Sequence, residues 1–280
     1  MSEPQELRDA REHIPRDLEL TKRTVVTVFT PEFRPDGTVE RPNGSGVLVE
    51  AGGHHFVFTA GHVIEGSSLA QIAVGFPTAV IVLPVEPGFG IARAERKPDS
   101  DVAYIELDRN KEWRWKDMCP LSVHNVASCP VKSDSVLLCG FPYEMSSSDS
   151  FVTPPERAGG KPVMQAAGGH GAITLRTHIA RGARHELEPP EGRGFHVGFN
   201  IIEDPELGGR KRIAPHGVSG GPVFLFDEAP ARLLGLVRSR HDGLLWCEPV
   251  CEVLQLLAEH PSHTVASDAK AALATLMEQQ

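Results

Sequence analysis

Short runs of apolar and β-branched residues, separated by Gly, Pro, Asn and Asp, are the feature that most constrains the fold of this chain. Runs of this length and composition are typical of β-strands and too short for most helices. Many such strands in succession predict an all-β sandwich or barrel architecture. The runs are "TVVTVFT" (24–30), "SGVLVEA" (45–51), "HFVFTA" (55–60), "QIAVGF" (71–76), "AVIVLPV" (79–85), "DVAYIEL" (101–107), "SVLLCGF" (135–141), "GAITLRTHIA" (171–180), "GFHVGFNII" (194–202), "GPVFLF" (221–226), "RLLGLV" (232–237) and "GLLWCE" (243–248).

The strands fall into two groups, with a changeover near residues 117–125, which favours two packed β-barrels. Apolar residues at helical spacing predict a helix over 248–260 and another over 267–280, where Ser267 or Asp268 could cap the second. Residues 143–162 are rich in Ser, Pro and Gly and predict a long surface loop. We therefore expect four parts: a charged leader (1–22), a first barrel (23–120), a second barrel (121–247) and C-terminal helices (248–280).

Charge and cysteine content limit the compartment and the partners. The formal net charge of −9 argues against nucleic acid or an anionic membrane as the main partner. The charged leader lacks the apolar core of an export signal, and no stretch approaches the roughly 18 apolar residues of a membrane span. An odd number of cysteines favours free thiols in a reducing compartment, so we expect a cytoplasmic protein. The five are Cys119, Cys129, Cys139, Cys247 and Cys251.

Three polar residues lie at strand edges and together suggest nucleophilic catalysis. His62 follows a strand in "FTAGHVI", Asp101 precedes one in "DSDVAYIEL", and Ser219 lies in a glycine-rich turn in "GVSGGPVF". A serine hydroxyl is a poor nucleophile until a base removes its proton, and an imidazole titrating near neutrality suits that task. A carboxylate can fix the tautomer of that imidazole. An interface between two barrels would bring the three residues together.

"TAGHV", "DVA" and "GVSGGP", in this order, resemble the chymotrypsin/trypsin-like serine peptidases, and within them the bacterial-type trypsin-like peptidase domain. The resemblance covers roughly residues 24 to 258. It implies two six-stranded antiparallel β-barrels with a C-terminal helix, with His62 as general base, Asp101 as its orienting acid and Ser219 as nucleophile. It also implies an oxyanion hole made by the backbone N–H groups of Gly217 and Ser219. The implied activity is serine endopeptidase, with a protein or peptide substrate and no cofactor.

The residue before the candidate nucleophile departs from many secreted members of that family. They carry an aspartate there, which pairs with a newly cut N-terminal ammonium, whereas this chain has Val218. Valine cannot hold a cation, so we expect that this turn is not set by such an insertion. Standalone bacterial proteases of this kind often act as effectors that a partner releases, so the resemblance also implies a regulatory protein partner.

Specificity is predicted from two regions of the second barrel. In the family, the residue six before the nucleophile lies at the base of the primary pocket, and this is Ile213. The strand "GLVRSRH" should line the groove and place Arg238, Ser239 and Arg240 near the substrate. These residues predict an apolar or acidic side chain before the scissile bond. The alternative is that both arginines face solvent.

Three other interpretations compete with the peptidase. "GVSGG" also fits the nucleophile elbow of α/β-hydrolases, but that fold needs an acid and then a histidine after the serine, on alternating strands and helices. A metal site is not expected, because His54 and His55 are adjacent on a strand and Cys247 and Cys251 lack a second pair at zinc-like spacing. A non-catalytic or latent binding module with the same fold remains the alternative.

Overall fold

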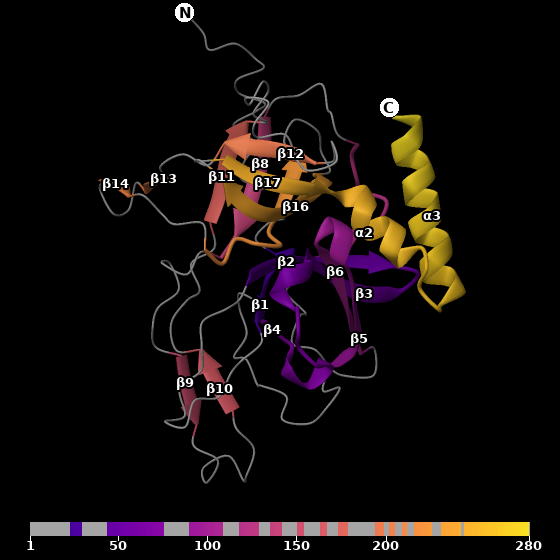
Figure 1. Ribbon diagram of the computed structural model, residues 1–280, viewed down its shortest axis with the longest axis horizontal. Helices are drawn as coiled ribbons and strands as arrows, with labels where there is room; N and C mark the ends of the chain where they lie inside the picture. Colours follow the sequence, from indigo (N-terminus) through magenta and orange to yellow (C-terminus); the bar gives the residue numbers. More distant parts are fainter. Residues whose placement is uncertain are drawn as a thin grey trace, which may run out of the picture.

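The structure is a computed structural model of the 280-residue chain. Two large antiparallel sheets stack above one another, and two helices lie along one side of them (Figure 1). The residues described are 23–29, 44–75, 90–108, 118–128, 135–141, 150–153, 163–166, 173–178, 194–198, 202–204, 209–211, 216–225, 231–241 and 244–279.

The first sheet has six antiparallel strands in the order β4-β1-β2-β3-β6-β5, and a short seventh strand, β7, pairs in parallel with β2. Val, Ile and Phe recur along its inner strands, where β-branched and aromatic side chains pack well. The hairpin between β2 and β3 turns at Gly52 and Gly53, both with positive φ, as its Gly-Gly sequence predicts. The strands are β1 (Val25–Phe29), β2 (Gly44–Ala51), β3 (His54–Ala60), β4 (Ala73–Gly75), β5 (Ile91–Lys97), β6 (Val102–Leu107) and β7 (Leu121–Ser122).

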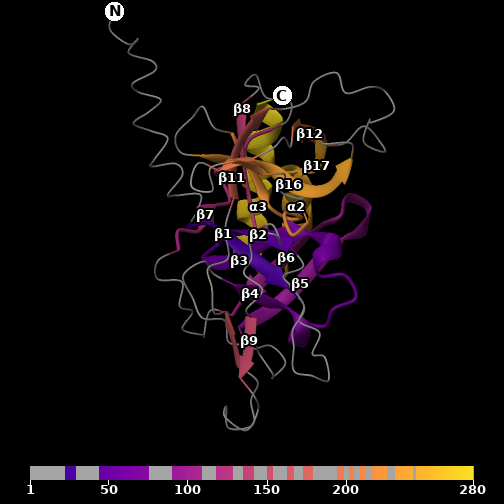
Figure 2. The same cartoon turned by 90° about the vertical axis from the view of Figure 1, so that its left-hand side faces the viewer.

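The second sheet has six antiparallel strands in the order β11-β8-β15-β16-β17-β12. Two further strand pairs, β9–β10 and β13–β14, lie apart from it (Figure 1), and Figure 2 also shows β9 separate from it. The strands are β8 (Ser135–Gly140), β9 (Ser150–Thr153), β10 (Val163–Ala166), β11 (Ile173–His178), β12 (Phe195–Gly198), β13 (Ile202–Asp204), β14 (Gly209–Lys211), β15 (Pro222–Leu225), β16 (Arg232–His241) and β17 (Leu244–Pro249).

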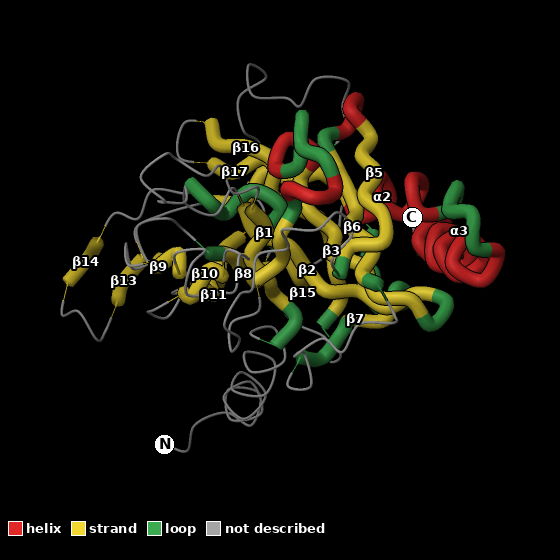
Figure 3. Tube along the Cα trace, turned by 90° about the horizontal axis from the view of Figure 1, so that it is seen from below, coloured by secondary structure: helices red, strands yellow, loops and turns green. Residues whose placement is uncertain are grey.

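Two helices follow the second sheet: α2 (Val250–Leu257) and α3 (His263–Glu278). Helix α2 contacts strands of both sheets, and α3 packs outside it at the edge of the molecule (Figure 3). In the part of the chain that the structure describes, neither helix has the length and apolar run that a membrane crossing needs.

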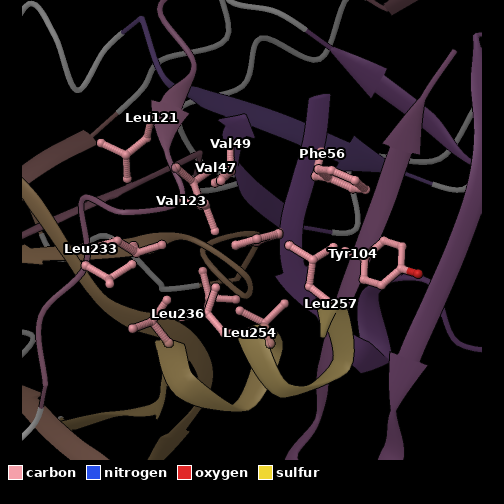
Figure 4. Packing of buried hydrophobic residues seen from close by; sticks show 14 of the residues in the cluster. Val47, Val49, Phe56, Tyr104, Leu121, Val123, Leu233, Leu236, Leu254 and Leu257 are labelled. Carbon is pink, nitrogen blue, oxygen red and sulfur yellow. The ribbon is translucent and has the colours of Figure 1, made fainter. Parts of the chain in front are cut away.

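The largest apolar cluster joins both sheets to both helices. Figure 4 shows Leu254 and Leu257 of α2 directed at side chains of the two sheets, among them Phe56 and Leu236. All four side chains are at most 1% exposed. Burial of each contributes about 1.5–3 kcal/mol. The helix is therefore part of the core that fixes one sheet against the other.

The expected fold class is confirmed: the protein is mostly β, with two curled antiparallel sheets of six strands and a helical C-terminal region. Several details differ, and three of them are informative. The expected loop over 143–162 contains a strand, β9, because its short "SFVT" run is flanked by so many Ser and Pro residues that its β-branched character is hidden. Strand β5 was not expected, since "IARAERK" is mostly charged; it is an edge strand that pairs with β6 alone in the described residues.

The third difference is that α3 begins before the predicted 267. Ser262, with extended backbone, precedes its first turn, and its side chain makes no capping hydrogen bond. The sequence suggested Ser267 or Asp268 as the cap of this helix, but the residue that precedes its first turn is Ser262. The predicted strand at 79–85 lies outside the described residues.

Candidate active site

His62 and Asp101 are brought together by the pairing of β3 with β6. His62 lies in a 3₁₀ turn, η1 (Gly61–Val63), directly after β3, and Asp101 lies between a second turn, η3 (Pro98–Ser100), and β6. In the antiparallel register Ala60 is opposite Val102, so the end of β3 meets the start of β6. Residues 39 positions apart thus become neighbours at one sheet edge.

The Asp101 carboxylate binds His62 at two points. Oδ1 accepts the backbone N–H of His62 (2.7 Å), and Oδ2 lies 2.8 Å from ring Nδ1. Because an ionised carboxylate only accepts, Nδ1 carries the proton and the neutral ring presents Nε2 as an acceptor. The His62 side chain is 42% exposed and that of Asp101 is 17% exposed. Asp101 therefore orients the imidazole through Nδ1, and much of the His62 side chain is accessible to solvent.

Asp101 adopts a left-handed backbone conformation (φ 49°), and no other non-glycine residue in the described part of the chain has positive φ. Its carbonyl accepts the N–H of Gly61 (2.8 Å). A Cβ on Gly61 would lie 3.0 Å from Oδ1 of Asp101, closer than ordinary contacts allow. Strained conformations of this kind persist where the surroundings determine them strongly, and here they aim the carboxylate at His62.

Ser219 lies in a tight turn that leads into β15. Gly217 (φ 90°) and Gly220 (φ 79°) on either side of it both take left-handed conformations that favour glycine. The Gly220 N–H donates to Val237 O (2.6 Å), which fastens the turn to β16. The hydroxyl of Ser219 donates to Arg238 O (3.4 Å), and among the described residues no hydrogen bond joins it to His62.

Among the described residues, the backbone N–H groups of Gly217 and Ser219 have no acceptor, and neither has that of Val218 between them. The next amide but one after Ser219, that of Gly221, is bonded to Val218 O (2.8 Å). Free, fixed N–H groups beside a hydroxyl are what an oxyanion of an acyl-transfer intermediate requires. The oxyanion hole expected at Gly217 and Ser219 stays a prediction.

Val218 is fully buried (0% exposed) in the apolar cluster of the second sheet. A Cβ on Gly140 would lie 3.0 Å from one of its methyl groups, so β8 packs closely against it. The turn is thus held from below by hydrophobic contact. An ammonium group at this place would have no carboxylate partner in residue 218.

Ser45 is a buried residue at this site that the sequence interpretation missed. Its hydroxyl donates to Gly217 O (2.7 Å) and accepts the N–H of Phe141 (2.9 Å). Its backbone N–H donates to Ser219 O (2.7 Å), and its carbonyl accepts the Thr59 hydroxyl (2.7 Å). The first sheet therefore holds both sides of the Ser219 turn. The available signal was a serine between two glycines at the start of a strand, "GSG".

The predicted specificity residues have three different outcomes. Ile213 lies outside the described residues. Ser239 and Arg240 are exposed on β16. Arg238 is half-buried, with Nε 3.5 Å from Oδ2 of Asp101 and Nη1 2.6 Å from Oε1 of Glu248.

Among the described residues, neither a candidate metal site nor a disulfide bond is present. No group of three or more His, Cys, Asp or Glu in the described ranges could hold a metal ion. The four described cysteines are not joined by disulfide bonds: Cys119, Cys139, Cys247 and Cys251. Cys129 lies outside the described residues.

The comparisons with known proteins add a distant structural likeness. No protein-family model matches the chain, and no curated protein sequence matches it. One solved structure that resembles it is Rv3671c from M. tuberculosis H37Rv, in the inactive form of a serine-to-alanine mutant. The two chains are 16% identical with a TM-score of 0.45, and the match covers 87% of this chain and 89% of that chain. The description of the site therefore depends on the geometry of this chain alone.

Proposed function

We propose that the protein is a serine endopeptidase that hydrolyses peptide bonds of protein substrates with Ser219 as nucleophile, His62 as general base and Asp101 as its orienting acid. The single observation that carries the proposal is the two-point contact of Asp101 with His62, at 2.7 and 2.8 Å. The same sheet also binds the Ser219 turn through a backbone hydrogen bond from Ser45. Such a contact fixes the imidazole in the tautomer that can accept a hydroxyl proton.

In this proposal, Nε2 of His62 takes the proton of the Ser219 hydroxyl while the oxygen attacks the substrate carbonyl. The resulting oxyanion is bound by the N–H groups of Gly217 and Ser219. His62 then gives its proton to the leaving amine, and the acyl-enzyme forms. Water, deprotonated by His62, releases the acid and restores the serine. Asp101 stabilises the imidazolium at each stage.

The apolar anchoring of Val218 supports a turn that forms without an ion pair to a new N-terminus. The negative net charge and the odd number of cysteines support a cytoplasmic location and no nucleic-acid or membrane partner. Control of such a protease would then fall to a regulatory protein partner. No cofactor is needed for this chemistry.

A second candidate function is a non-catalytic or latent binding module. The observation in its favour is that the Ser219 hydroxyl donates to Arg238 O (3.4 Å) instead of to His62. A hydroxyl held on a carbonyl is not activated until it turns toward the imidazole. The two candidate functions differ in one respect: in the peptidase, the Ser219 hydroxyl turns toward His62 without the help of a partner protein.

A serine-directed fluorophosphonate probe separates them. We expect the wild-type protein to be labelled, Ser219→Ala not to be labelled, and Ser267→Ala, an exposed serine of α3, to be labelled as the wild type is. Labelling of Ser219→Ala would contradict the assignment of the nucleophile. Absence of wild-type labelling under all conditions would favour the binding module.

Substrate choice needs a separate measurement. Comparing new protein termini in a proteome exposed to active protein and to Ser219→Ala would give the residue before the scissile bond. We expect an apolar or acidic residue there. Preferred cleavage after Arg or Lys would refute the pocket inferred from Ile213 and its neighbours.

A further inference from the structure

Arg238 is the residue of the second sheet that touches both ends of the candidate triad. Its guanidinium Nε lies 3.5 Å from Oδ2 of Asp101, the same oxygen that His62 Nδ1 binds at 2.8 Å. Its backbone carbonyl accepts the hydroxyl of Ser219 (3.4 Å). One residue of β16 therefore contacts the acid through its side chain and the nucleophile through its main chain.

The guanidinium of Arg238 is held in place by two further groups. Nη1 donates to Oε1 of Glu248 at 2.6 Å, and the guanidinium carbon lies 4.4 Å from the centre of the Trp246 ring. Glu248 and Trp246 both belong to β17, the neighbour of β16. An arginine that is stacked and ion-paired has lost most of its rotamer freedom, so its charge occupies a fixed position.

Several charged groups surround Arg238. Asp101 and Glu248 both lie against its guanidinium, and Glu252 of α2, whose charge acts on Glu248, is paired with Lys97 of β5 (2.7 Å). Burial raises the pKa of the Glu248 carboxyl, and the hydrogen bond from Arg238 lowers it again in part. The 2.6 Å bond to the guanidinium favours the ionised form of this carboxyl.

We propose that Arg238 is a positioning residue of the proposed peptidase, which holds Asp101 toward His62 and whose charge, balanced by Glu248, sets the pH at which His62 becomes an active base. The inference rests on the proposed function for its effect on the rate. Its electrostatic part concerns the imidazole itself and holds whether or not the protein cleaves peptides. In this role the guanidinium is committed to two carboxylates, and it is not the group that receives a substrate side chain.

The proposal predicts opposite effects for the two partners. Arg238→Gln removes a cation near the imidazolium, so His62 should be protonated more readily and the acid limb of the pH profile of kcat/KM should move to higher pH. Glu248→Gln leaves the cation uncompensated, so that limb should move to lower pH. A single charge gained or lost near a partly solvated group gives a shift of about half a pH unit.

The experiment measures the titration of His62 in two ways. The pH profile of kcat/KM reports it through the rate, and the ring protons of His62 in NMR, assigned with His62→Gln, report it without any turnover. Wild type, Arg238→Lys, Arg238→Gln and Glu248→Gln are compared. Arg238→Lys keeps the charge and should leave the midpoint of the His62 titration unchanged. Its kcat should be lower, because the guanidinium that stacks on Trp246 is lost. Arg93→Gln, an arginine paired with Glu95 on β5, is the matched control and should shift nothing.

The double variant Arg238→Gln/Glu248→Gln covers the case in which a single variant does not fold, since it leaves no unpaired buried carboxylate. Its midpoint should lie above that of Glu248→Gln, or above that of the wild type if Glu248→Gln is the variant that fails to fold. Shifts in the same direction for both single variants, or no shift in any, would overturn the proposal. A wild type that no fluorophosphonate labels would defeat the proposed function alone, because the NMR midpoints still decide the role of Arg238.

Discussion

Replacing Ser45 with alanine removes one hydroxyl that satisfies two buried backbone groups. The side chain is fully buried, donates to Gly217 O (2.7 Å) and accepts the Phe141 N–H (2.9 Å). Each group left without a partner costs about 1–3 kcal/mol, so after some relaxation the loss should be about 2–4 kcal/mol. For a chain of this size that lowers the Tm by about 3–7 °C.

The same substitution should slow the proposed reaction. With its carbonyl released, Gly217 can rotate, and its N–H then no longer points at the oxyanion. Complete loss of one such donor costs about 10²–10³ in kcat, so we expect a fall of about tenfold or more. KM should change little, because Ser45 lies beneath the turn and does not face the substrate.

The assay is urea unfolding together with steady-state kinetics of Ser45→Ala. Ser267→Ala, in which the serine is exposed on α3, is the matched control and should change neither quantity. If Ser45→Ala unfolds within about 0.5 kcal/mol of the wild type, a range typical of surface substitutions, the two hydrogen bonds do not hold the turn. If the variant is destabilised but its kcat is unchanged, the two hydrogen bonds of Ser45 stabilise the fold and do not contribute to catalysis.

Three further predictions follow from the same region. Val218→Asp places an unpaired charge in a fully buried site and should destabilise the protein by about 3–5 kcal/mol, whereas Val218→Ala should cost about 1–2.5 kcal/mol, both measured by chemical denaturation; equal losses would contradict the apolar anchoring. Gly220→Ala should destabilise by at least about 2 kcal/mol and abolish probe labelling, because φ is 79° and a Cβ would collide with the Ser45 carbonyl and the Thr59 hydroxyl; a fully labelled variant would refute the crowding. Burial raises the pKa of the Cys251 thiol, so native Cys251 should react with iodoacetamide more slowly than Cys251 in urea. The stability that the protonated thiol contributes is complete below the ordinary pKa of a thiol and is lost as the pH rises through the raised pKa. The Cys251→Ala variant should not show this loss of stability at alkaline pH.

The sequence predicted most of the fold because the two sheets consist of apolar runs with clear turn residues between them. It failed where a strand lacks that pattern. Strand β5 is an edge strand whose exposed face is charged, so its alternation of Arg, Glu and Lys resembles a surface loop. Strand β9 is too short to stand out among Pro and Ser residues.

For the candidate site, the sequence located the residues that local motifs mark. His62, Asp101 and Ser219 each lie beside a strand, and the structure brings the first two into contact. Ser45 was missed because its role comes from a contact with Gly217, 172 positions away, which no local pattern encodes. The environment of Arg238 was missed for the same reason, since Asp101 and Glu248 reach it from different parts of the fold.

The place of the two helices in the chain order has a consequence for biosynthesis. Residues 250–278 complete the apolar cluster that joins the sheets, and Asp268 of α3 accepts the N–H of Gly52 (2.7 Å) in the first sheet. During translation both sheets leave the ribosome before these helices, so neither can reach its final docking until the helices have emerged. A chain cut short before residue 250 would then carry His62, Asp101 and Ser219 without the apolar contacts that fix one sheet against the other.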